Sequence, residues 1–102
     1  MASYPVAMHL AFSGEVWSWR GPSPYHFITV PDDESAEIED VSALVTYGWG
    51  VIPVAVRIGE THWTTSLFPK DGGYLVPLKD AVRKAEGIAV GDTVAVQLDV
   101  DV

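Results

Sequence analysis

Apolar and polar residues alternate along several short stretches of the chain, which is the pattern of β-strands with one face in a protein core. Even-numbered positions from Met8 to Val16 carry apolar side chains or glycine, and most odd-numbered positions between them carry polar ones. We interpret Gly14, which interrupts the apolar face, as a β-bulge. The same analysis predicts six strands, at residues 8–19, 25–30, 51–58, 61–68, 74–76 and 93–100.

Two other segments show apolar residues at helical spacing. From Ile38 onward such residues follow an acidic run at residues 32–34, and acids suit the positive N-terminal end of a short helix. A second short helix is expected at residues 78–86, where Gly87 ends it in a left-handed cap.

Glycine-containing turns join several of the predicted strands. Gly59 and Glu60 fit a two-residue hairpin loop, and residues 69–73 form a second turn. The predicted fold is therefore mainly β (α+β), with about six strands and two short helices.

Length and composition favour one soluble domain that spans residues 1–102. The chain is 48% hydrophobic and 11% aromatic, which is enough apolar material for a core. It has no cysteine, so disulfides, thiolate metal sites and a cysteine nucleophile are excluded. Residues 1–10 lack the features of a targeting signal, and no stretch approaches the roughly 18 to 20 apolar residues of a membrane span. We expect a cytoplasmic protein without a membrane partner.

Fourteen acidic residues against six basic ones give a net charge of −8, which makes a nucleic-acid partner unlikely on electrostatic grounds. Lys79 and Arg83 are four residues apart, so we expect them on one exposed helix face next to Lys84, with Lys70 in the preceding turn. This cationic patch would hold a carboxylate, a phosphate or an acidic partner. Alternatively, these residues compensate an acidic surface and the negative end of the helix.

Six short motifs occur in a fixed order along the chain. They are Phe12-x-Gly-x-Val-Trp17, Phe27-Ile-Thr-Val-Pro31, Gly48-Trp-Gly50, Trp63-Thr-Thr-Ser-Leu-Phe-Pro69, Val82-Arg-Lys-Ala-Glu-Gly87 and Val90-Gly-Asp-Thr-Val94. In this order and spacing the chain resembles the bacterial domain of unknown function 1905 family, from about residue 7 to residue 100. The resemblance implies a small double-split β-barrel, related to AbrB- and MazE-like transcription factors and found alone or fused to segments of the YdeI/OmpD-associated type. It transfers no catalytic or ligand-binding residue to this chain.

The sequence predicts no metal site, no cofactor and no catalytic residue. His9, His26 and His62 lie on predicted strands without the short spacings of metal ligands. Ser66 and His62 supply two members of a nucleophilic triad, but Ser66 lacks the strained Gly-x-Ser-x-Gly turn of such enzymes. We interpret Ser66 as an ordinary strand residue.

Aromatic side chains carry more information, since four Trp and four Tyr are many for 102 residues. Trp17 and Trp19 share a strand face, and Trp49 lies in a glycine-flanked turn. Two uses remain open, which are filling the barrel and lining a ligand groove. The candidate ligand-binding residues are Trp17, Trp19, Tyr25, His26, Trp49, Trp63, Ser66, Lys79 and Arg83.

These features predict a non-catalytic binding module with an aromatic groove bordered by a basic helix. Its expected partner is a small organic or anionic ligand, a protein, or a second copy of the chain paired along an exposed edge at residues 94–100. The alternatives are a nucleic-acid-associated regulator of the AbrB- or MazE-like barrel type and, third, a hydrolase.

Overall fold

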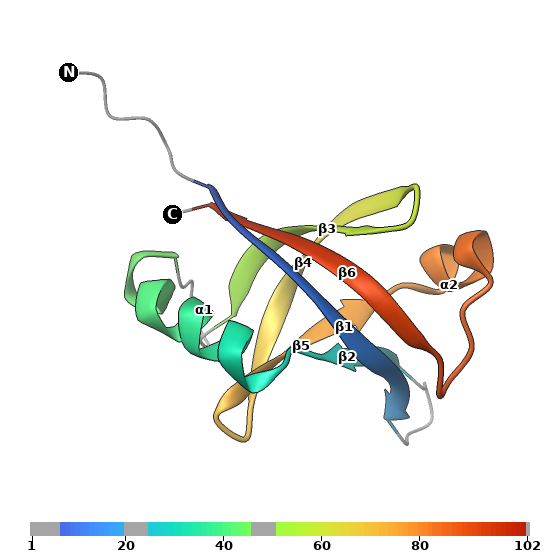
Figure 1. Ribbon diagram of the computed structural model, residues 1–102, viewed down its shortest axis with the longest axis horizontal. Helices are drawn as coiled ribbons and strands as arrows, with labels where there is room; N and C mark the ends of the chain where they lie inside the picture. Colours follow the sequence, from blue (N-terminus) through green and yellow to red (C-terminus); the bar gives the residue numbers. More distant parts are fainter. Residues whose placement is uncertain (1–6, 20–24, 46–50, 102) are drawn as a thin grey trace.

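The computed structural model describes residues 7–19, 25–45 and 51–101, and six strands and two helices lie in these ranges (Figure 1). In chain order they are β1 (Ala7–Trp19), β2 (Tyr25–Thr29), α1 (Asp32–Val45), β3 (Ile52–Ile58), β4 (Thr61–Lys70), β5 (Gly73–Leu78), α2 (Asp80–Glu86) and β6 (Thr93–Asp101). The mainly β fold predicted from the alternation is confirmed. Neither described helix is long and apolar enough to cross a membrane.

The strands close into an antiparallel barrel in the order β1-β2-β5-β4-β3-β6, with β6 returning to pair with β1. Two long strands each serve two partners. The β1 strand pairs with β6 up to Glu15 and with β2 from Val16. Likewise, β4 pairs with β3 up to Leu67 and with β5 from Phe68. The β1 and β4 strands therefore belong to both halves of the barrel.

Gly14 lies where β1 passes from one partner to the other, and it is not a bulge. The pairing of β1 with β6 runs without interruption through Gly14 and Val94, so the predicted bulge is wrong. A Cβ atom on Gly14 would come within 2.5 Å of Cγ2 of Ile28 and 3.1 Å of the carbonyl oxygen of Thr29. Glycine is therefore required here because β2 crosses β1 at close range.

The interior is filled by one face of each strand. Along β3, Ile52, Val54, Val56 and Ile58 are buried, and the residues between them are more exposed. Along β6, Val96, Leu98 and Val100 are buried in the same way. However, residues 94–100 do not form a free edge, because β6 pairs with β1 and, from Gln97 to Val100, also with β3.

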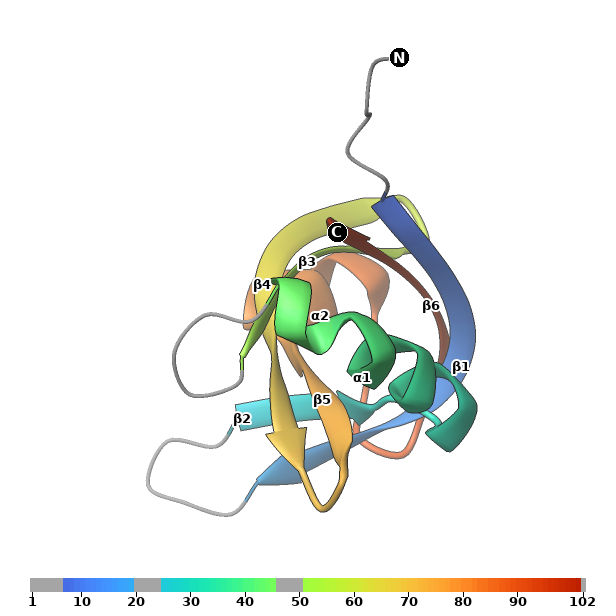
Figure 2. The ribbon, with the colours of Figure 1, turned by 90° about the vertical axis from the view of Figure 1, so that its left-hand side faces the viewer.

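The two helices lie at opposite ends of the barrel, and α1 crosses the end that faces the viewer in Figure 2. The α1 helix begins at Asp32 and is longer than expected, with the acidic run in its first turn. It places Ile38 in the core. The α2 helix begins at Asp80, two residues later than predicted, because Leu78 still pairs with β2.

The left-handed cap predicted for Gly87 is confirmed. Gly87 has φ 64° and ψ 38°, and the next residue, Ile88, donates its backbone N–H to the carbonyl oxygen of Arg83 at 2.9 Å. Both predicted hairpins are also present. The second is tighter than expected, since only Asp71 and Gly72 separate β4 from β5, with φ values of 52° and 80°.

Candidate functional site

The outer surface of β1, β2, β5 and β4 carries a group of aromatic side chains. Trp17 on β1 lies opposite Phe27 on β2, and Trp19 lies opposite Tyr25. Leu75 of β5 pairs with Thr29 of β2 on one side and with Phe68 of β4 on the other, so these three side chains lie on the same face of the sheet. We use the name aromatic face for the surface formed by Trp17, Trp19, Tyr25, Phe27, Phe68 and Lys70.

Several rings of the aromatic face are exposed to solvent. Trp19 is 50% exposed, Tyr25 64% and Phe68 47%. Across the described residues the exposed large hydrophobic side chains are these three and Val90, so three of the four lie on one face. Such a concentration is not needed for the core, which is built from the other face of the same strands.

Contacts within the aromatic face hold its rings in place. The Trp17 ring lies 5.3 Å from that of Phe27 and 6.4 Å from that of Trp19, measured between centroids. The indole Nε1–H of Trp17 donates a hydrogen bond to Oγ1 of Thr29 at 3.0 Å. Trp17 is therefore fixed by neighbours on two strands, whereas Trp19 presents half of its surface to solvent.

Lys70 supplies the positive charge of the aromatic face. Its Nζ atom lies 5.3 Å from the centroid of Trp17 and 4.7 Å from that of Trp19, within the range of cation–π contacts. The sequence analysis grouped Lys70 with the basic residues of the α2 region. In the structure the ammonium of Lys70, at the end of β4, instead reaches the tryptophans of β1, although β2 and β5 lie between β1 and β4 in the sheet order.

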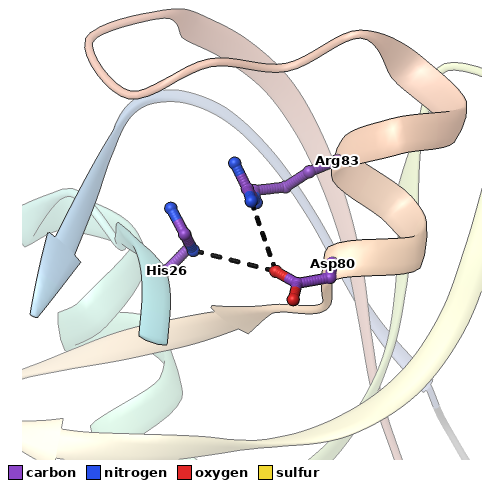
Figure 3. Close-up of polar contacts among 3 residues, drawn as sticks. All are labelled: His26, Asp80 and Arg83. Atoms are coloured by element: carbon purple, nitrogen blue, oxygen red, sulfur yellow. Dashed lines mark hydrogen bonds and ion pairs between the residues drawn. The ribbon is translucent and has the colours of Figure 1, made fainter. Parts of the chain in front are cut away.

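A second polar cluster lies where α2 follows β5, and it contains His26, Asp80 and Arg83 (Figure 3). Arg83 donates from Nη2 to Oδ1 of Asp80 at 3.3 Å. Nδ1 of His26 approaches the same oxygen to 4.0 Å, which is too far for a hydrogen bond. The side chains of His26 and Arg83 are only 12% and 24% exposed, whereas that of Asp80 is 71% exposed.

This geometry corrects the prediction that Lys79 and Arg83 form one exposed cationic face. Lys79 precedes the helix as its N-cap residue and is exposed. Arg83 turns instead toward Asp80 and is largely buried. The guanidinium of Arg83 is thus paired within the chain, with the carboxylate of Asp80.

Some buried side-chain nitrogen atoms of the described residues have no hydrogen-bond partner. Within the described part of the chain they are Nδ1 of His26, Nε1 of Trp63 and Nε of Arg83. Thr61, which shares the inner face of β4 with Trp63, donates to Oε2 of Glu86 in α2 at 2.6 Å. Trp63 packs against the core, so the structure supports the interpretation that this tryptophan fills the barrel interior.

A pocket of about 390 Å³ lies between α1 and the β4–β5 hairpin. It is lined by Glu39, Pro69, Lys70, Asp71, Gly72, Gly73 and Tyr74. The hydroxyl of Tyr74 donates to Oε2 of Glu39 at 2.7 Å. Burial raises the pKa of Tyr74 to about 12, and the hydrogen bond and negative charge of Glu39 add to the effect of burial.

The structure thus divides the predicted site residues between separate places. Trp17, Trp19 and Tyr25 come together on the aromatic face, and Ser66 lies two positions before Phe68 on the outer side of β4. His26 and Arg83 meet near α2, and Trp63 points inward. Trp49 lies outside the described residues.

Sequence reasoning missed Phe27, Phe68 and Lys70 as members of the aromatic face. The alternation along β4 contained a signal, because Phe68 and Lys70 are two positions apart and so share one side of the strand. What the alternation could not supply was the neighbour on the next strand. No group of three or more His, Asp or Glu side chains able to hold a metal ion is found in the described ranges.

Fold and site together define a small closed antiparallel β-barrel with a partly exposed aromatic outer face. A family model described as domain of unknown function (DUF1905) matches residues 12–98. The chain belongs to this family, which confirms the resemblance found in the six motifs. A comparison with curated proteins gave no match.

Proposed function

We propose that this barrel is a non-catalytic binding module that takes a small organic ligand or a protein segment on its aromatic face. The observation that carries the proposal is the exposure of Trp19, Tyr25 and Phe68 on one side of the barrel. Large exposed aromatic side chains are enriched in binding surfaces, where their burial supplies much of the affinity.

The rigidity of the aromatic face also favours this function. Trp17 is held by the ring of Phe27 and by Thr29, so binding would order few additional side chains. Bases could also stack on such rings, but the charge of −8 opposes the approach of nucleic-acid phosphates. An organic ligand or a protein segment therefore fits this surface better than nucleic acid.

Thermal-shift screening of the full chain against metabolites and short peptides tests the proposal. We expect at least one compound to raise the melting temperature, and we expect Trp19→Ala to weaken its binding about tenfold or more. Because Trp19 is half exposed, this variant should remain folded. Val90→Ala serves as the matched control, since Val90 is an exposed hydrophobic residue outside the aromatic face. Equal affinities for Trp19→Ala and Val90→Ala would contradict the proposal.

A further inference from the structure

Two tryptophans of the aromatic face already hold a cation in the free domain. The ammonium of Lys70 lies within 5.3 Å of the Trp17 centroid and 4.7 Å of the Trp19 centroid, so one cation contacts both rings. The rings stand 6.4 Å apart and are tilted by 51°, which leaves room for an ammonium beside both. Lys70 is exposed and comes from the end of β4, whereas the tryptophans belong to β1.

We infer that the Trp17–Trp19 pair is a lysine-binding site, in which the ammonium of a basic peptide segment of a partner protein replaces that of Lys70. The inference rests on the proposed function and names the chemistry of the partner. Lys70 is an internal competitor that occupies the site until the partner arrives.

The charge of the protein favours a basic partner over an acidic one. Fourteen acidic residues against six basic ones give a net charge of −8, which attracts a lysine-rich segment and repels an acidic one. Charge complementarity and the local cation–π geometry therefore select the same class of partner.

Lys70 also has an acidic place to occupy after displacement. It lines the pocket of about 390 Å³ together with Glu39 and Asp71, whose carboxylates can receive its ammonium. The exchange thus transfers Lys70 from two rings to two acids, and the lysine of the partner gains the rings. Neither ammonium is left without a favourable environment.

The strength of this competition can be estimated. An exposed cation–π contact favours the state in which the Lys70 ammonium lies over the rings by a factor of about two to five. A site with such an internal competitor binds an external lysine about three to six times more weakly than an empty site does. Removing the Lys70 ammonium should strengthen binding by that factor.

Isothermal titration of the full chain with pentalysine at low ionic strength tests the inference. Lys70→Met keeps the apolar stem and should lower the dissociation constant about three- to six-fold. Lys79→Met makes the same change of charge at an exposed residue preceding α2, so it should alter the constant less than two-fold. Trp19→Ala should weaken binding, and pentalysine acetylated on its side chains should not bind.

Equal effects of Lys70→Met and Lys79→Met would overturn the inference, because net charge alone would then explain the binding. So would pentalysine affinity that does not change in Trp19→Ala. If pentalysine fails to bind but another compound binds in a Trp19-dependent way, the lysine site is wrong and the proposed function stands. If no compound depends on Trp19, both proposals fail.

Discussion

Gly14 gives the sharpest test of how the barrel is closed, because a single added methyl group would meet two fixed atoms. In Gly14→Ala the new Cβ lies 2.5 Å from Cγ2 of Ile28, which is fully buried, and 3.1 Å from the carbonyl oxygen of Thr29. Overpacking of this kind costs about 1–3 kcal/mol. The loss of chain entropy in the unfolded state offsets about 0.4–1 kcal/mol of that cost.

Mid-range values of the two effects leave a net loss of about 1 kcal/mol, which for a domain of this size corresponds to about 4–8 °C in melting temperature. Thermal and urea denaturation followed by circular dichroism would measure it. Gly73→Ala is the matched control, because it makes the same change in a strand and its Cβ comes no closer to any atom than 3.3 Å, at Oγ of Ser35. Because the same entropy gain acts on Gly73→Ala without a severe clash, we expect that variant to be as stable as the parent or more stable by up to about 1 kcal/mol. Equal melting temperatures for the two variants would refute the close crossing of β1 and β2.

Three further variants probe contacts around the site. Tyr74→Phe removes the hydrogen bond to Glu39 and should cost about 1 kcal/mol in urea denaturation. The pKa of Tyr74 is raised from 10.0 to about 12, so the folded protein keeps a proton that the unfolded chain loses, and stability should fall between these pH values, less steeply in Tyr74→Phe. Gly87→Ala forces a left-handed φ on alanine and should cost about 1–2 kcal/mol, measured by thermal denaturation. Thr61→Val removes the hydrogen bond to Glu86 and should cost about 1–2 kcal/mol, also measured by thermal denaturation. An unchanged melting temperature would show that α2 is held to β4 by other contacts.

Local patterns in the sequence were sufficient to predict the strands and the caps. The period of two along residues 8–19 separated the core face from the face that bears Trp17 and Trp19. Gly87 was identified as a helix cap because the conformation required there is local to a few residues. These features depend on neighbours in the chain, so the sequence alone carries them.

Features that depend on pairing between distant strands could not be predicted in this way. Lys70 lies over the tryptophans through a contact between the ends of β4 and β1, two strands that do not pair with each other. The spacing from Lys79 predicted that Arg83 lies on an exposed helix face. In the structure the Arg83 side chain turns toward Asp80 and is mostly shielded from solvent. The need for glycine at position 14 arises from the crossing with Ile28, which alternation does not reveal.

The central claim is that the aromatic face is where this domain binds its partner, and indole resonances report on it directly. The compound that stabilises the full chain most in the thermal-shift screen should be titrated into ¹⁵N-labelled protein while the indole N–H signals are followed. We predict that the signals of Trp17 and Trp19 move with increasing ligand and that the signal of the inward-facing Trp63 stays in place. A shift confined to Trp63, with Trp17 and Trp19 unchanged, would contradict the account.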